Sequence, residues 1–270
     1  MASLPKITER ISESIAIGVV TNGDRIELQA ILFEIPAPSE HGAHVKNVTF
    51  YRCLFTHQMI IGATFQGCTF MECQFNGARI KDCEFHQCKI IESCFYKSSI
   101  SGTYLDPSSF VFSYRWYTKW ANVNAWWYQA LYRNAKDTHQ ERFARLADER
   151  FQFYRRYEYI LGKKKQPRLF FLSLVYDFLL GYGYGVLNVL VFTCIFIAIF
   201  AFFMQQNTSP AATSIIDHIY FAVVSFTTVG YGDVTPKHER AALAITTGFL
   251  FLSFVWGAIV TAVLVKRLVK

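Results

Sequence analysis

The sequence predicts a mixed fold, with a soluble repeat domain near the N-terminus and an all-α membrane module at the C-terminus. Two observations predict it: bulky apolar residues recur at every fifth position from residue 50 to residue 110, and two long uncharged stretches follow residue 185. The composition agrees, because 52% of the 270 residues are hydrophobic and 17% are charged. Those values lie between a soluble domain and a protein made only of membrane spans.

The repeat occupies residues 46–110, and its period of five fits neither an α-helix nor a flat strand. The bulky residues are Phe50, Phe55, Ile60, Phe65, Phe70, Phe75, Ile80, Phe85, Ile90, Phe95, Ile100, Leu105 and Phe110. A mostly small side chain stands two residues before each of them, at Val48, Cys53, Gln58, Ala63, Cys68, Cys73, Ala78, Cys83, Cys88, Ser93, Ser98, Thr103 and Ser108. This pattern resembles the pentapeptide-repeat family, whose fold is a right-handed four-sided β-helix with one pentapeptide on each side.

The resemblance implies that each side of the β-helix recurs every twenty residues, so that the bulky residues form four stacked columns. The columns are Phe50, Phe70, Ile90 and Phe110; Phe55, Phe75 and Phe95; Ile60, Ile80 and Ile100; and Phe65, Phe85 and Leu105. Residues 1–45 are expected to cap the open end, because a solenoid end exposes unpaired strand edges. They lack a basic start followed by an apolar run, which argues against a cleaved secretory signal.

Six of the seven cysteines fall in the repeat. Four of them share its five-residue spacing and can be interpreted as a metal ladder or as small inward residues: Cys68, Cys73, Cys83 and Cys88. No histidine or carboxylate joins them at a zinc-finger spacing, so we favour buried thiols that stay reduced in the cytosol, with no structural metal.

Residues 111–165 lose the five-residue period and are expected to form a linker of two helices. Thr138 and Glu141 have the spacing of a capping box, which would start the second helix. A stripe of large side chains follows at Phe143, Leu146, Phe151 and Tyr154. We interpret this stripe as a surface for packing between subunits rather than as a ligand-binding site.

The membrane module, residues 186–265, contains two stretches long enough to cross a membrane as helices, an outer helix at 186–204 and an inner helix at 241–265. Lysine and arginine flank the pair on its outer sides, including the short tail at 266–270. The positive-inside rule therefore places both termini in the cytoplasm and residues 205–240 outside. The expected location is the plasma membrane, which in a bacterium is the inner membrane.

Residues 166–185 are expected to form a helix followed by a hinge. The apolar stretch at 169–180 is too short to cross a membrane alone, so it either lies in the membrane interface or extends the first span, and we favour the interfacial helix. Gly181, Gly183 and Gly185 would supply the bend after it.

The connection between the two spans is too apolar for an external loop and is expected to re-enter the membrane as a pore helix over 213–226. Ser214 and Asp217 have the spacing of a capping box at its start. The string Thr-Thr-Val-Gly-Tyr-Gly-Asp follows at residues 227–233. This string resembles the signature of two-helix potassium channels of the pore-loop family, in which four such segments form the selectivity filter.

The resemblance implies that backbone oxygens in the filter at Thr228, Val229, Gly230, Tyr231 and Gly232 replace the water shell of a potassium ion, and that the hydroxyl group of Thr228 adds one more ring of ligands. The two glycines ease an alternation of normal and left-handed backbone that points consecutive carbonyl groups the same way. One copy of the string per chain implies a homotetramer. Potassium would be a permeant ligand, and no cofactor is expected.

Four neighbours are expected to support the filter: Thr227, Asp233, Tyr220 and Phe221. Tyr231 would pack against the two aromatic residues of the pore helix. Some potassium channels carry an acidic residue where this sequence has Val224, and they often have a hinge glycine where it has Leu252. Gly248 and Gly257 are therefore the candidate hinges of the inner helix.

A second Gly-Tyr-Gly string, at residues 181–185, lacks the preceding pore helix and the following aspartate and is not expected to be a filter. Neither span carries the arginine series of a voltage sensor, so a gating signal would enter through the repeat domain or the helices at 111–180. The resulting hypothesis is a potassium-selective channel regulated by its cytoplasmic repeat domain and by an unknown cytoplasmic partner. Contacts with membrane lipids are also expected.

Three other functions fit the sequence less well: imitation of DNA, a membrane-anchored scaffold or non-conducting subunit, and an enzyme. Imitation of DNA, known for some pentapeptide-repeat proteins, needs an acidic surface, whereas residues 46–110 carry six basic and five acidic residues, and nucleic acid is not an expected partner either. A scaffold with a membrane anchor, or a non-conducting subunit, would not need the intact string at 227–233. An enzyme is disfavoured because the histidines are scattered and none has a nucleophile or metal partner at a useful spacing: His57, His86, His139, His218 and His238.

Overall fold

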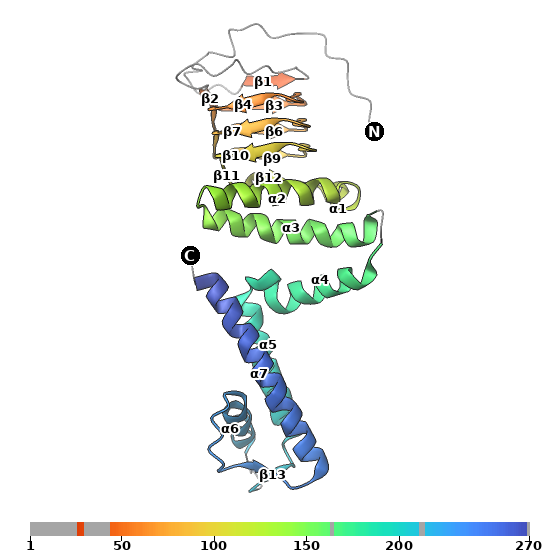
Figure 1. Ribbon diagram of the computed structural model, residues 1–270, viewed down its shortest axis with the longest axis vertical. Coiled ribbons are helices and arrows are strands. Elements are labelled where there is room, and N and C mark those ends of the chain that lie inside the picture. The colour runs from red at the N-terminus through yellow and green to blue at the C-terminus, as the bar shows by residue number, and fades with distance from the viewer. Residues whose placement is uncertain (1–25, 30–43, 163–164, 211–213, 269–270) are drawn as a thin grey trace. The chain divides into compact units, whose positions relative to one another are not determined.

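The computed structural model describes residues 26–29, 44–162, 165–210 and 214–268 (Figure 1). The chain divides into two compact units, Met1–Phe171 and Leu172–Lys270. The first contains parallel strands followed by helices, and the second contains mainly helices.

The first unit is built on a β-solenoid. Its strands are β1 (Ile26–Gln29), β2 (His44–Lys46), β3 (Val48–Tyr51), β4 (Met59–Ile61), β5 (Thr64–Gln66), β6 (Thr69–Met71), β7 (Arg79–Lys81), β8 (Glu84–His86), β9 (Lys89–Ile91), β10 (Ser99–Ser101), β11 (Tyr104–Leu105) and β12 (Phe110–Val111), with a short 3₁₀ helix η1 (Pro107–Ser109) before the last. They form three parallel sheets with the orders β1-β3-β6-β9-β12, β10-β7-β4 and β11-β8-β5-β2. Isolated bridges between Leu54, Gln74 and Cys94 make the fourth side.

The four predicted columns are confirmed by the pairing register. Phe50 is opposite Phe70, Ile60 is opposite Ile80, and Phe65 is opposite Phe85. On the fourth side, the rings of Phe55 and Phe75 stack with 4.5 Å between their centroids, and those of Phe75 and Phe95 with 4.6 Å. A constant shift of twenty residues therefore places each bulky side chain on its equivalent in the next coil.

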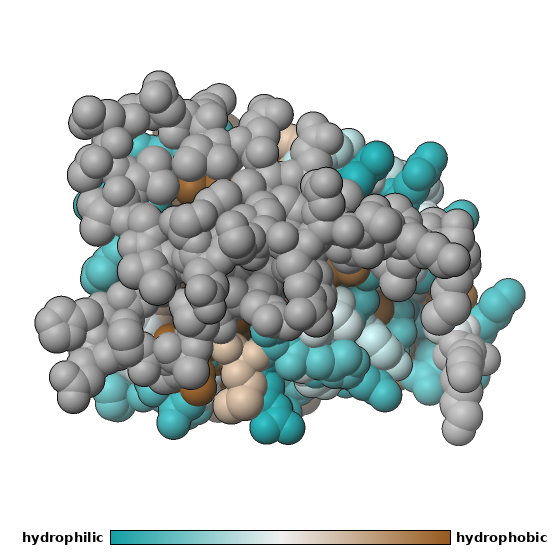
Figure 2. Space-filling view, turned by 90° about the horizontal axis from the view of Figure 1, so that it is seen from above, coloured by the Kyte–Doolittle hydropathy of each residue, from teal (hydrophilic) through white to brown (hydrophobic). Residues whose placement is uncertain are grey.

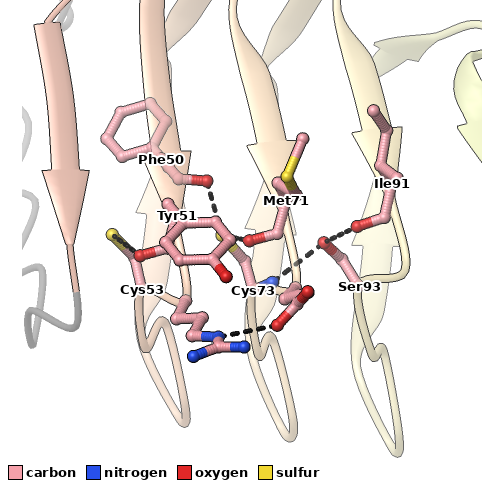
Figure 3. Close-up of polar contacts among 9 residues, drawn as sticks. Phe50, Tyr51, Cys53, Met71, Cys73, Ile91 and Ser93 are labelled. Atoms are coloured by element: carbon pink, nitrogen blue, oxygen red, sulfur yellow. Dashed lines mark hydrogen bonds and ion pairs between the residues drawn. The ribbon is translucent and has the colours of Figure 1, made fainter.

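Five cysteines of the solenoid are small buried side chains: Cys53, Cys68, Cys73, Cys83 and Cys88. Figure 3 shows two of them, Cys53 and Cys73, with their hydrogen bonds. The Cys73 thiol donates a hydrogen bond to the carbonyl oxygen of Phe50 at 3.3 Å, and the Ser93 hydroxyl makes the same contact with Phe70 one coil later, also at 3.3 Å. On the outside, Arg52 and Glu72 of successive coils form an ion pair at 2.7 Å. Thiol and hydroxyl thus serve the same structural purpose in this ladder.

Many of the outward positions of the strands are polar, although Met59 and Val111 are exposed apolar exceptions. In β7, for example, Ile80 is buried between exposed Arg79 and Lys81. Most of the described side chains in the view of Figure 2 are accordingly hydrophilic.

Only a small part of the expected N-terminal cap falls within the described residues. Strand β1 pairs in parallel with β3, with Leu28 opposite Phe50. The strand thus continues the first sheet and satisfies the edge of β3. The rest of the cap, residues 1–25 and 30–43, lies outside the described part of the chain.

The other end of the solenoid is covered by helices α1 (Tyr114–Thr118), α2 (Ala121–Asp137) and α3 (Glu141–Leu161). Trp127, which is fully buried, stacks on Phe95 with 4.3 Å between the ring centroids. The side-chain amide of Asn134 donates to the carbonyl oxygen of Thr103 at 2.7 Å and accepts from its N–H at 3.0 Å. Asn134 therefore gives the last coil the pair of hydrogen bonds that a further strand would supply, a cap that the sequence analysis missed.

Two expectations for this helical region were wrong. Thr138 is not in a capping box with Glu141, because its hydroxyl donates to the carbonyl oxygen of Asn134 at 2.8 Å and so ends α2. The stripe expected to pack between subunits is largely used within the chain. Tyr154 is 2% exposed and stacks on Tyr128, with 5.5 Å between centroids.

The second unit contains α5 (Val186–Phe203), β13 (Thr208–Ser209), α6 (Ile215–Phe226), β14 (Thr235–Pro236) and α7 (Arg240–Leu268). Helix α4 (Pro167–Leu180) crosses the division between the units, and the 3₁₀ turn η2 (Gly181–Gly183) separates it from α5. Helices α5 and α7 are long and apolar enough to cross a membrane. The break at η2 means that α4 does not simply extend the first span.

Candidate ion-binding site

Helix α6, the expected pore helix, begins with the expected capping box. The Ser214 hydroxyl accepts a hydrogen bond from the N–H of Ile216 at 3.2 Å, and the Asp217 carboxylate accepts one from the N–H of Ser214 at 3.1 Å. At the other end, the Thr227 hydroxyl donates to the carbonyl oxygen of Val223 at 2.8 Å. Backbone groups at both ends of this short helix are thus hydrogen-bonded. The C-terminal end, where the helix dipole is negative, lies at the start of the string at residues 227–233.

Residues 228–232, which we call the filter segment, have an unusual backbone. The φ angles of Thr228, Gly230 and Gly232 are +57°, +57° and +79°, whereas those of Val229 and Tyr231 are not positive. Glycine adopts such angles readily, but for a β-branched residue such as Thr228 they are strained. The alternation that the sequence analysis expected is therefore present, and it extends to a residue that does not favour it.

Most carbonyl groups of this segment meet no donor among the described residues. In the part of the chain that the structure describes, the carbonyl oxygens of residues 228–231 accept no hydrogen bond. Neighbouring N–H groups turn back to the pore helix, since those of Thr228 and Val229 donate to Ser225 and Val224 at 3.1 Å each. The segment is anchored through its donors and leaves a row of oxygens available as ligands.

The side chains of the filter segment project from a single chain without being covered. Val229 is 52% exposed and Tyr231 is 72% exposed. Asp233, which follows the segment, accepts a hydrogen bond from the Tyr220 hydroxyl at 2.8 Å. This bond joins the outer end of the segment to the pore helix.

The expected packing of Tyr231 on Phe221 needs correction. Phe221 is 5% exposed and faces the first span, where its ring centroid lies 5.7 Å from that of Phe200. Phe200 in turn stacks on Phe249 of α7 at 3.7 Å. Phe221 therefore fixes α6 against both spans and does not support Tyr231 in the same chain.

The second Gly-Tyr-Gly string has a different backbone and different partners. Three consecutive residues, Gly181, Tyr182 and Gly183, have positive φ angles of 50°, 57° and 83°. Two of its carbonyl groups, those of Tyr182 and Tyr184, accept hydrogen bonds from Lys266 at 3.4 Å and Arg267 at 3.1 Å. The same three-residue string thus forms a tight bend here rather than a row of free oxygens.

The contact between this bend and the end of α7 was not anticipated. Besides its hydrogen bond to Tyr182, Lys266 places its Nζ atom 3.8 Å from the centroid of the Tyr184 ring. The sequence contains both the basic end of α7 and the glycine-rich bend, but no signal in it shows that they meet. We call the contacts that Lys266 and Arg267 make with the bend the α7 latch.

The candidate hinges Gly248 and Gly257 both lie inside the continuous helix α7. A Cβ atom added at either position would meet no heavy atom within 4 Å. Leu252, halfway between them, is 54% exposed. Neither glycine is therefore required by packing within one chain.

Comparison with known proteins identifies two separate parts of the chain. Residues 188–270 match the family described as "Ion channel", and residues 49–87 match eight copies of the family described as "Pentapeptide repeats". The first of these families consists of ion channels and not of enzymes.

The curated relatives are potassium channels. The chain is 30% identical over 84 residues to Two-pore potassium channel 4 of Arabidopsis thaliana, covering 30% of this chain and 30% of that protein. It is 36% identical over 66 residues to a hyperpolarization-activated voltage-gated potassium channel of Methanocaldococcus jannaschii, covering 24% of this chain and 31% of the relative. The matched segment thus spans about a third of the length of these relatives.

Among solved structures, a trypsin-treated variant of QnrB1, a plasmid-mediated fluoroquinolone resistance protein, is 21% identical. The alignment covers 30% of this chain and 54% of that protein, with a TM-score of 0.23. So low a TM-score supports no conclusion about fold or function.

The strand pairing of the solenoid and the two family matches agree on the parts that make up the chain. Residues 188–270 match an ion-channel pore family, residues 49–87 match pentapeptide repeats, and about a third of the chain or less is distantly related to potassium channels.

Proposed function

We propose that this protein is the subunit of a potassium-selective channel in which the filter segment binds the permeant ion. The observation that carries the proposal is the alternating backbone at Thr228, Gly230 and Gly232, combined with carbonyl oxygens that no donor in the described residues meets. A strained φ angle at a threonine indicates function when the surrounding structure holds it in place. Here the hydrogen bonds from the segment's N–H groups to α6 hold it.

Potassium is the ion that this chemistry fits. Rows of backbone carbonyl groups replace the hydration shell of potassium in channels of this kind. The segment offers neutral oxygens from Thr228, Val229, Gly230 and Tyr231 and places no carboxylate among them. The names of the curated relatives support the same ion.

A single filter segment cannot surround an ion, so we propose a homotetramer with the four segments around one axis. Val229 and Tyr231, exposed in the single chain, would then be covered by neighbouring subunits. The two membrane helices would cross the plasma membrane with both termini in the cytoplasm, since basic residues lie at the end of α7 and near the start of α4.

We propose that the N-terminal unit regulates conduction through α4 and the bend. Helix α4 connects that unit covalently to the bend at residues 181–185, and the bend holds the end of α7 through the α7 latch. In two-helix channels the second span lines the pore, so movement of the bend would be transmitted to the pore lining. The exposed apolar side chains of α4, among them Phe171 and Phe178, are suited to the membrane interface.

The experiment that tests the proposal is ion flux into liposomes containing purified protein, with potassium compared against sodium. We expect the wild-type protein to favour potassium, and Gly230→Ala to lose this preference, because alanine is strained at a φ of +57°. Gly248→Ala is the matched control. Its site has no neighbour within 4 Å, so the ratio of potassium to sodium flux should not change.

Equal flux of both ions through the wild-type protein would contradict the selectivity. No flux at all, from a protein shown to be a tetramer by native mass spectrometry, would instead favour the alternative of a pentapeptide-repeat scaffold with a membrane anchor.

A further inference from the structure

The helices of the N-terminal unit carry a groove that the channel function does not use. It consists of two adjoining cavities of 580 and 720 Å³, both lined by Asn122, Arg155 and Glu158. The first lies where α2 and α3 meet the last coil of the solenoid, and the second continues toward Lys119 and the end of α3. Volumes of this size are typical of sites for small molecules. We call the two cavities together the α2–α3 groove.

The charge of the groove favours an anion. Three cations line it, Lys97, Lys119 and Arg155, against one carboxylate from Glu158. None of the three cations forms an ion pair with a carboxylate among the described residues. An unneutralised cluster of this kind attracts phosphate or carboxylate groups.

Arg155 is held in a defined position. Its guanidinium carbon lies 5.6 Å from the ring centroid of Phe151, one turn earlier in α3, and 5.6 Å from that of Tyr159, one turn later. Contacts on both sides reduce the freedom that a long side chain would lose on binding. The guanidinium group therefore needs less ordering to receive an anion than a side chain without these contacts would.

The first cavity also presents exposed aromatic rings. Trp126 is 44% exposed and Tyr96 is 48% exposed, although both line the cavity. Lys97 lies beside them, with its Nζ atom 5.4 Å from the centre of the Tyr96 ring. Exposed rings next to cations suit a flat aromatic group that carries negative charge, because the ring stacks while the charge is paired.

We propose that the α2–α3 groove binds a nucleotide, with the base on Trp126 and Tyr96 and the phosphates on Lys97, Lys119 and Arg155. The amides of Asn122 and Gln129 lie in the same lining and provide the hydrogen-bonding groups that an aromatic base requires. The groove lies wholly in the N-terminal unit. Binding can therefore be measured without reference to the proposed filter.

The test is isothermal titration calorimetry of the purified full-length protein with ATP, adenosine and inorganic triphosphate in parallel. We expect saturable binding of ATP that is tighter than that of either fragment. Arg155→Gln should weaken ATP binding about tenfold, as expected for one charge-assisted hydrogen bond. Trp126→Ala should weaken binding of both ATP and adenosine about fivefold, through lost stacking.

Matched controls lie on exposed positions outside the groove. Arg133→Gln removes a cation from α2, and Tyr114→Ala removes a ring that is 73% exposed. Neither should change the affinity more than about twofold. Circular dichroism of every variant will show whether the fold is retained.

Three results would overturn the proposal. One is the absence of saturable ATP binding by the folded protein. Another is triphosphate binding as tight as that of ATP with Trp126→Ala unchanged, which would indicate a general anion site. The third is an equal loss in Arg133→Gln and Arg155→Gln, which would indicate attraction to overall charge. Because calorimetry reads binding alone, each of them leaves the channel proposal standing.

Discussion

The hydroxyl group of Tyr220 in α6 donates a hydrogen bond to the carboxylate of Asp233, with 2.8 Å between the two oxygens. This bond links the pore helix to the residue that follows the filter segment. It holds the end of the segment near Asp233. The other end is held by hydrogen bonds from the N–H groups of Thr228 and Val229 to α6.

Removal of this hydroxyl should loosen the outer end of the filter. In Tyr220→Phe we expect potassium flux to decline faster during a sustained assay, because a bond worth about 1 kcal/mol is lost in each subunit. The measurement is the time course of flux into liposomes. Tyr114→Phe, which changes an exposed ring in the other unit, is the control. Identical time courses for both variants would show that the bond does not stabilise the filter.

The hydroxyl of Thr228 should contribute one ring of ligands. Thr228→Ser keeps this oxygen and should retain the preference for potassium. Thr228→Ala removes the oxygen and should lower the ratio of potassium to sodium flux about fivefold, as expected for the loss of about 1 kcal/mol. If the two variants have the same ratio, the hydroxyl is not an ion ligand.

The bend before α5 should tolerate no side chain at Gly185. An added Cβ would lie 3.0 Å from the Cα atom of Gly181 and 3.1 Å from the carbonyl oxygen of Leu180, and backbone atoms cannot move aside cheaply. We therefore expect Gly185→Ala to destabilise the protein by about 1–3 kcal/mol, seen as a lower melting temperature in detergent. Gly248→Ala should leave that temperature unchanged or raise it, because alanine is the better helix former. Equal melting temperatures for the two variants would contradict this account of the bend.

The aromatic column should be the main source of stability in the solenoid. The Phe70 ring is 1% exposed, stacks on Phe50 at 4.8 Å and contacts Phe75 edge to face at 5.7 Å. We expect Phe70→Ala to cost about 3–5 kcal/mol in the unfolding of the N-terminal unit, measured by urea titration with circular dichroism. Met59→Ala, at a side chain that is 57% exposed, should cost less than about 0.5 kcal/mol. A small loss from Phe70→Ala would mean that the coils can close around the gap.

Alkaline pH should destabilise the N-terminal unit through the buried thiol of Cys83. Burial raises the pKa of the Cys83 thiol above its ordinary value. A raised folded-state pKa means that stability is complete below the unfolded pKa and falls as pH rises through that value and toward the folded one. We expect unfolding to become easier above about pH 8.5, the ordinary pKa of a thiol. Cys83→Ser should reduce this dependence, and an unchanged slope would assign it to other groups.

Much of the solenoid could be predicted because the register of its strands follows from one number, the five-residue period of the bulky side chains. Once Phe50 and Phe70 belong to one column, the period of five determines every other pairing, and the structure confirms all four columns. The capping box at Ser214 was predictable for a similar reason, since it depends on residues only three apart.

Local spacing was misleading where two elements compete for one residue. Thr138 stands between α2 and α3, and its hydroxyl can serve the end of one helix or the start of the other. The structure uses it for α2, while Glu141 forms an ion pair with Lys136 at 2.7 Å. Sequence spacing alone cannot show whether the free energy is lower when Thr138 ends α2 or when it starts α3.

Contacts between segments far apart in the sequence also could not be predicted. Periodicity indicated that one face of α3 is buried, but not that Tyr154 packs on Tyr128 of the same chain. Nor did it indicate that Asn134 completes the last coil, or that Lys266 reaches the bend. Each of these contacts depends on how the chain returns on itself, which no local pattern records. The string at residues 227–233 resembles a known signature because that signature is a run of consecutive residues, and its role as an ion filter stays a prediction.

The constant twenty-residue shift between coils has a consequence for how such a protein can change during evolution. Every coil presents the same edges to the next, so a whole coil can be gained or lost without altering either end of the stack. Each such event would lengthen or shorten the domain by one strand spacing, about 4.8 Å. The repeat domain is in this sense a spacer of adjustable height, whose reach can be varied in uniform steps while the helices at its far end remain unchanged.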